Sequence, residues 1–175
     1  MQIVNIVASG DLHQKIALSE LKEQLGDCMQ YDKAKYHGGY VDLGGIKATI
    51  YKSGKYIFTG VKSIDEIQIY YQRFAKILSI YLDKSLFSEP VVKNIVAIYQ
   101  YPHEFNLHTL FTQKLIGLAE FEPEVFPGLI WKIKEKGCVL VFGSGKVIYS
   151  GVNSEMDLNN LKSYFDDFLD IFPEY

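Results

Sequence analysis

Apolar side chains recur every three or four residues in two long segments of the chain, which is the period of a helix with one face against a core. The positions are Ile67, Tyr70, Phe74, Ile77 and Tyr81 in one segment, and Leu158, Leu161, Phe165, Phe168 and Phe172 in the other. Ser63 stands three residues before Glu66, and Ser154 three before Asp157, which is the spacing of a capping box at a helix start. Each pattern therefore predicts a long helix that begins after its serine.

Shorter apolar segments, bounded by turn residues, predict strands. The expected strands are Ile3–Ser9, Lys47–Tyr51, Lys55–Thr59, Val92–Tyr99, Val139–Phe142 and Lys146–Ser150. Two short helices are expected from Leu18, Leu21 and Leu25 and from Leu107, Leu110 and Phe111. A Ser-Gly-Lys sequence in each half predicts a hairpin turn, and Gly60 and Gly151 are expected to end the strands that follow these turns.

The same order of elements occurs twice because the sequence repeats itself. Asn5-Ile6-Val7-Ala8 recurs as Asn94-Ile95-Val96-Ala97, and Gly60-Val61-Lys62-Ser63 recurs as Gly151-Val152-Asn153-Ser154. A repeat of this length is a whole supersecondary unit, longer than the repeats that stack into solenoids. We therefore expect one domain over residues 1–175, with repeat one at 1–89 and repeat two at 90–175.

The last strand of each repeat is largely apolar on both faces. In the first of these strands, Tyr56 and Phe58 point away from Ile57 and Thr59, because successive side chains of a strand alternate between faces. The two long helices occupy equivalent places in the repeats, so they can cover only one face of an antiparallel sheet. The uncovered, partly apolar face is the predicted binding surface.

Composition restricts the partners of this surface. The chain is 48% hydrophobic with a formal net charge of −3. Residues 1–89 hold 11 Lys and Arg against 10 Asp and Glu, whereas residues 90–175 hold 7 against 11. An acidic chain binds nucleic acid only through local basic patches, since phosphate neutralisation supplies much of the affinity. No apolar stretch is long enough to span a membrane, so no membrane partner is expected.

No catalytic or metal-binding pattern stands out. Gly143-Ser144-Gly145-Lys146 is similar to part of a phosphate loop, but Leu140 occupies the place of its first glycine and Val147 follows the lysine. Neither the two cysteines nor the four histidines have the spacing of metal ligands. We therefore expect no enzyme activity, no metal and no cofactor.

The sequence Glu122-Pro123-Glu124-Val125-Phe126-Pro127-Gly128-Leu129, followed by Leu140-Val141-Phe142-Gly143-Ser144-Gly145-Lys146, closely resembles the second repeat of the TATA-binding protein family. Repeat one carries the resemblance in Ile3-Val4-Asn5-Ile6-Val7-Ala8 and in Thr59-Gly60-Val61-Lys62-Ser63. The resemblance implies an α+β saddle, in which a curved ten-stranded antiparallel sheet has four helices on its convex side. The chain has no N-terminal extension, and in this it resembles archaeal members of the family more than nuclear ones. The resemblance implies a cytoplasmic protein of the archaeal nucleoid, or a nuclear protein if the source is a eukaryote.

The resemblance also implies a function in transcription initiation. Members of the family bind the minor groove of A/T-rich promoter DNA, kink it with aromatic wedges and recruit the B-type initiation factor, and through it the RNA polymerase machinery. By residue match, the implied DNA-binding positions are Asn5, Val7, Tyr36, Tyr51, Lys55, Ile57, Thr59, Lys62, Asn94, Val96, Phe126, Lys132, Leu140, Phe142, Lys146, Ile148 and Ser150. Glu122 and Glu124 match the acidic loop that meets the B-type factor. A homodimer of the DNA-free protein is a further alternative.

Repeat one departs from the family pattern. Both of its wedge positions, Tyr36 and Tyr51, are tyrosines, and Asp42 stands where a basic residue usually meets phosphate. A buried phenol needs a hydrogen-bond partner, so we expect weaker or asymmetric DNA engagement, with repeat two dominant. The alternative is a divergent paralogue that acts as a protein-binding transcription regulator and bends DNA weakly or not at all.

Overall fold

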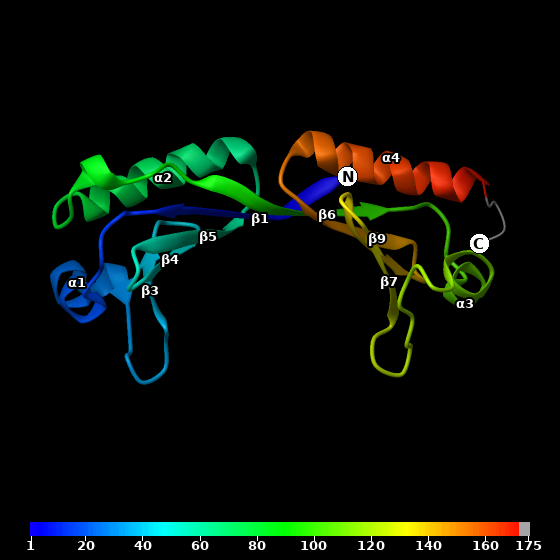
Figure 1. Ribbon diagram of the computed structural model, residues 1–175, viewed down its shortest axis with the longest axis horizontal. Helices are drawn as coiled ribbons and strands as arrows, with labels where there is room; N and C mark the ends of the chain where they lie inside the picture. The colour runs from blue at the N-terminus through cyan, green and yellow to red at the C-terminus, as the bar shows by residue number, and fades with distance from the viewer. Residues whose placement is uncertain (172–175) are drawn as a thin grey trace. The chain divides into compact units, whose positions relative to one another are not determined.

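The computed structural model describes residues 1–171, which divide into two compact units. One unit is Asn5–Lys93, and the other combines Met1–Val4 with the chain from Asn94 onward. In Figure 1, α2 lies along β5 in the first unit and α4 along β9 in the second. Phe172, the last position of the predicted second stripe, lies outside the described residues. Within those residues, no helix is long and apolar enough to cross a membrane.

Repeat one contains five strands and two α-helices. In chain order its elements are β1 (Gln2–Asp11), α1 (Leu18–Leu25), the 3-10 turn η1 (Gly26–Cys28), β2 (Met29–Gln30), β3 (Gly38–Asp42), β4 (Lys47–Tyr51), β5 (Lys55–Val61), α2 (Ile64–Leu78) and the 3-10 turn η2 (Lys84–Leu86). The strands are ordered β2-β3-β4-β5-β1, and each pairs with its neighbours in the antiparallel sense.

Repeat two has the same plan with one strand fewer. Its elements are β6 (Val91–Gln100), α3 (Leu107–Leu110), the π-helical turn η3 (Phe111–Leu115), β7 (Gly128–Ile133), β8 (Gly137–Phe142), β9 (Lys146–Val152) and α4 (Glu155–Ile171). The strands are ordered β6-β9-β8-β7, again antiparallel.

The α+β class is confirmed, but the described residues form nine strands where ten were expected. The missing strand is the counterpart of β2 in repeat two. There, Glu120 and Ile130 form a single antiparallel bridge, with N···O distances of 2.8 and 2.9 Å in the two directions. One bridged residue is too short to count as a strand, although it occupies the same edge of the sheet.

Each long helix covers one face of its sheet. In repeat one, the Phe74 ring lies 4.7 Å from the Tyr56 ring and 5.3 Å from the Phe58 ring. The helical stripe of α2 ends at Leu78, which is fully buried, whereas Tyr81 lies beyond the helix and is 41% exposed. The prediction that Tyr81 belongs to this stripe was therefore wrong.

The prediction that two glycines end their strands was also wrong. β5 continues through Gly60 to Val61, and β9 continues through Gly151 to Val152. The φ angles of the two glycines are +88° and +79°, which L-residues with side chains rarely adopt, and the pairing register shifts beside each one. The glycines therefore form bulges within the strands.

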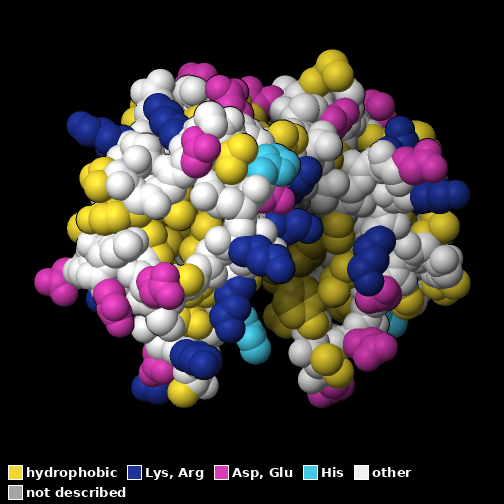
Figure 2. Space-filling model, turned by 60° about the vertical axis from the view of Figure 1, so that its left-hand side comes forward, with side chains coloured by type: hydrophobic (Ala, Val, Ile, Leu, Met, Phe, Trp, Pro, Cys, Tyr) yellow, Lys and Arg dark blue, Asp and Glu magenta, His cyan; other side chains and the backbone are white. Residues whose placement is uncertain are grey.

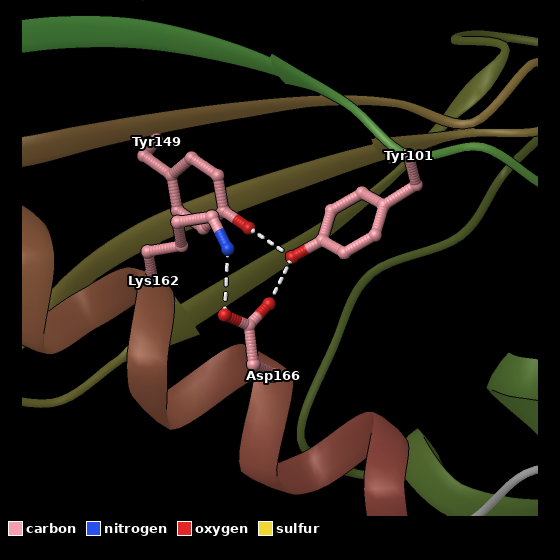
Figure 3. A network of polar contacts seen from close by, with 4 residues as sticks. All are labelled: Tyr101, Tyr149, Lys162 and Asp166. Atoms are coloured by element: carbon pink, nitrogen blue, oxygen red, sulfur yellow. Dashed lines mark hydrogen bonds and ion pairs between the residues drawn. The ribbon is translucent and has the colours of Figure 1, made fainter. Parts of the chain in front are cut away.

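A polar cluster joins α4 to the sheet of its own unit (Figure 3). The Tyr101 and Tyr149 hydroxyl oxygens are 2.8 Å apart, and the Tyr101 hydroxyl donates to the Asp166 carboxylate. Lys162 Nζ lies 2.6 Å from the other carboxylate oxygen of Asp166. Burial and the hydrogen bond to Asp166 raise the pKa of Tyr101, so this hydroxyl keeps its proton as a donor.

Candidate nucleic-acid interface

The face of each sheet opposite α2 or α4, which we call the open face, carries the predicted DNA-binding side chains. In repeat one, Ile6, Ala8, Tyr56 and Phe58 are buried beneath the helix. The alternating positions are partly exposed on the open face, and they are Asn5, Val7, Tyr51, Ile57 and Thr59. Strand alternation thus brings these five predicted residues to one surface.

Repeat two follows the same alternation. Ile95, Ala97, Val139, Val141, Val147 and Tyr149 are buried on the helix side. The predicted residues Asn94, Val96, Leu140, Phe142, Ile148 and Ser150 alternate with them on the open face. Hydrophobic side chains and Lys and Arg side chains are exposed next to one another over the surface seen in Figure 2.

A glycine bulge orients one asparagine in each open face. The Gly60 N–H donates to Asn5 Oδ1 at 2.7 Å, and the Gly151 N–H donates to Asn94 Oδ1 at 2.8 Å. Because a backbone N–H can only donate, it fixes the carbonyl side of each amide toward the glycine. The NH₂ group of each asparagine then remains as a hydrogen-bond donor within a largely apolar surface.

Two phenylalanines form an aromatic pair at the end of the open face in repeat two. The Phe126 and Phe142 ring centroids are 5.7 Å apart, with the planes at 67°. Gly128 lies beneath both rings, since a Cβ atom there would come within 2.8 Å of Phe126 Cε1 and 3.0 Å of Phe142 Cε1. The missing side chain at Gly128 allows the two rings to meet.

The tyrosines at the matching positions of repeat one are arranged differently. Tyr36 is 45% exposed, and its ring packs edge-on against Tyr40, with centroids 5.3 Å apart. Tyr51 lies over Gly38, where a Cβ atom would come within 3.4 Å of the Tyr51 Cδ1 atom. The ring partner of Tyr36 in repeat one is therefore Tyr40 of β3, whereas the ring partner of Phe126 in repeat two is Phe142 of β8.

The predicted phosphate-binding lysines differ in their surroundings. Lys132 Nζ lies 2.9 Å from Glu120 Oε1, and the hydrogen bond and charge of this carboxylate raise the pKa of the lysine. Lys146 Nζ lies 5.8 Å from the Phe142 ring centroid, and Lys55 and Lys62 are exposed at the two ends of β5. Lys132 is thus held by a carboxylate of its own chain.

The acidic residues Glu122 and Glu124 lie in an exposed turn before β7. The carbonyl of Glu122 accepts hydrogen bonds from the Val125 and Phe126 N–H groups, both at 2.9 Å. This turn leads directly into Phe126, so it joins the acidic residues to the aromatic pair. Both glutamates are exposed, as a partner-binding role requires.

Sequence reasoning missed several residues of the open face. Lys47 and Thr49 share the parity of Tyr51 on β4, and Cys138 shares that of Leu140 on β8. The same strand alternation that indicated the other positions could have found them.

Burial raises the pKa of the Cys138 thiol. No cluster that could hold a metal ion occurs among residues 1–171.

Comparisons with known proteins agree with this geometry. The family model for "Transcription factor TFIID (or TATA-binding protein, TBP)" matches residues 1–81 and 89–172. The chain is 33% identical over 174 residues to TATA-box-binding protein C of Halobacterium salinarum, covering 94% of each chain. It is 33% identical over 167 residues to the TATA-box-binding protein of Thermoplasma volcanium, covering 89% of this chain and 86% of the relative.

A solved structure supports the same assignment. The structure of Methanococcus jannaschii TBP superposes with a TM-score of 0.78 at 30% sequence identity, over 99% of this chain and 98% of that one. The fold defines a class of α+β proteins built from two repeats, in which each long helix covers one face of the sheet and leaves the other face open. The chain belongs to the TATA-binding protein family.

Proposed function

We propose that this protein is a transcription initiation factor that binds the minor groove of A/T-rich TATA-box promoter DNA and kinks it. The observation that carries the proposal is the fixed orientation of Asn5 and Asn94, whose NH₂ groups are donors within an apolar surface. In the minor groove, A·T and T·A pairs present only acceptors, whereas G·C pairs add the guanine NH₂ donor. A fixed donor therefore favours A·T pairs and disfavours G·C pairs.

Kinking is proposed to come from the aromatic pair of repeat two. Apolar side chains that enter a base step unstack it partially and bend the duplex toward the major groove. The Phe126 and Phe142 rings already contact one another before DNA arrives, so little ordering is needed on binding. This arrangement supports repeat two as the stronger wedge.

The acidic turn is proposed to recruit the B-type initiation factor, and through it the RNA polymerase machinery. Glu122 and Glu124 add negative charge beside the aromatic pair, which suits a basic partner surface. This part of the proposal predicts that the partner binds the protein–DNA complex through the turn that precedes β7.

The test is a bending assay on a short A/T-rich duplex that carries one fluorophore at each end. We expect energy transfer between the ends to rise to saturation with protein and to fall as salt is added. Phe126→Ala should abolish the rise, because it removes one ring of the wedge. The matched control is Tyr164→Ala, which removes an aromatic ring from the helix-covered side of the same unit.

The outcome also decides between the proposal and its alternative. Energy transfer that stays flat with wild-type protein, with and without the B-type factor, would contradict the proposed kinking of the promoter. A flat signal would favour a protein-binding regulator. The contacts of Tyr36 with Tyr40 and of Lys132 with Glu120 also fit that alternative.

A further inference from the structure

The two repeats place their basic residue on opposite strands of the same strand pair. In repeat two, Lys132 on β7 pairs in register with Cys138 on β8. In repeat one, the equivalent pair is Asp42 on β3 with Lys47 on β4. The equivalence follows from the wedge positions, because Gly38 pairs with Tyr51 as Gly128 pairs with Phe142. The lysine thus lies on β4 in repeat one and on β7 in repeat two. The open face of each repeat therefore carries one lysine at this strand pair.

Each of these lysines contacts one residue from the edge of its sheet. Lys47 Nζ lies 3.3 Å from Gln30 Oε1, and Lys132 Nζ lies 2.9 Å from Glu120 Oε1. Gln30 and Glu120 are equivalent, since Gln30 pairs with Tyr40 on β3 as Glu120 pairs with Ile130 on β7. The amide of Gln30 is neutral, whereas the carboxylate of Glu120 carries a charge. The Lys47 ammonium therefore faces a neutral group in this contact, whereas the Lys132 ammonium is paired with an opposite charge.

Two aspartates of repeat one are held in turns, namely Asp42, which is paired in register with Lys47, and Asp32, which follows β2. Asp42 Oδ1 accepts a hydrogen bond from the Gly44 N–H at 2.8 Å, and Asp32 Oδ1 accepts one from the Ala34 N–H at 2.9 Å. Both carboxylates close local turns, which is a common use of aspartate. The substitution of Asp42 for a basic residue is thus explained by the turn between β3 and β4, and the adjacent Lys47 supplies the charge.

We propose that Lys47 is the phosphate contact of repeat one, and that the edge residues Gln30 and Glu120 set how strongly each repeat holds the DNA backbone. The inference depends on the proposed DNA binding. In repeat one, Lys47 would then be available to bind a phosphate, because its partner Gln30 is neutral. Repeat two would hold phosphate weakly, because Lys132 must leave Glu120 before it can neutralise a phosphate.

The test exchanges the two edge residues. Each phosphate contact contributes about 0.9 to the slope of log affinity against log salt, so one contact changes the affinity about 3.5-fold between about 50 and 200 mM salt. We expect Lys47→Gln to make the slope shallower by up to about 0.9, because it removes the charge, and Gln30→Glu to do the same, because it pairs that charge within the chain. We expect Glu120→Gln to make it steeper by up to the same amount and to strengthen binding at low salt.

Matched controls separate these contacts from a change in net charge. Glu155→Gln removes the same charge as Glu120→Gln from an exposed residue of α4, and Gln68→Glu adds a charge on α2. Both controls should leave the slope within about 0.2 of wild type. Thermal melts followed by circular dichroism check that each variant is folded.

The outcomes distinguish this inference from the proposed function. If wild-type protein bends the duplex but Gln30→Glu and Glu120→Gln give slopes equal to those of their controls, the roles of Lys47 and its edge residue are wrong while promoter binding stands. Absence of wild-type binding at both salt concentrations would contradict both proposals.

Discussion

At the scale of single residues, the Tyr101 hydroxyl connects the end of β6 to β9 and α4. It contacts the Tyr149 hydroxyl and the Asp166 carboxylate, which are 48 and 65 residues away along the chain. Tyr101 is 8% exposed, so a loss of its oxygen removes the partner of the buried Tyr149 hydroxyl, while Asp166 keeps its ion pair with Lys162. No local pattern in the sequence indicates such a cluster.

Tyr101→Phe is expected to lower the free energy of unfolding by about 1–3 kcal/mol, because an unsatisfied buried polar group loses its hydration without compensation. The control is Tyr99→Phe, which keeps the ring that lies 4.2 Å from Lys162 Nζ. Urea denaturation of both variants measures the difference. Equal stability of the two variants would show that the Tyr101 hydrogen bonds contribute nothing net.

At the scale of elements, the two long helices start differently despite their similar sequence signals. Asp157 N–H donates to Ser154 Oγ at 3.0 Å, and the Ser154 hydroxyl donates to Asp157 Oδ2 at 2.6 Å, so α4 has a side-chain cap. Ser63 precedes α2 but makes no such hydrogen bond, and Glu66 instead accepts from the Lys62 N–H at 3.2 Å. Both helices begin after their serine as predicted, but only Ser154 makes the side-chain hydrogen bonds of a capping box.

This difference predicts unequal effects of the same substitution. Ser154→Ala should lower the free energy of unfolding by about 1 kcal/mol, because it removes an N-cap acceptor. Ser63→Ala should change it by less than about 0.5 kcal/mol, as expected for a surface position without such a bond. Denaturant titration of the two variants is the measurement, and a larger loss for Ser63→Ala would contradict the assignment.

At the scale of the whole molecule, the two repeats have diverged in complementary ways. Repeat two has the paired phenylalanine rings, but its lysine forms an ion pair with Glu120. Repeat one has an available lysine, but its Tyr36 ring contacts Tyr40. We therefore expect repeat one to supply more of the electrostatic attraction and repeat two more of the kink.

Tyr36→Ala tests this division in the bending assay. We expect it to weaken DNA binding by less than about tenfold, or about 1.4 kcal/mol, and to leave most of the rise in energy transfer. Phe126→Ala is the reference for loss of a paired ring. Equal losses for the two variants would show that both repeats insert a wedge of similar strength.

The sequence by itself determined the repeat, the α+β class and the face on which the predicted DNA-binding residues lie. These follow from local periods of two and 3.6 residues and from motifs of a few consecutive residues, which are properties of the chain alone. Only the tertiary structure decided the asparagine orientation, the partner of Tyr36, the pairing of Lys132 with Glu120 and the role of Asp42 in a turn. Each of these depends on which atoms meet after strands pair in a particular register, and a strand sequence does not specify its partner's register.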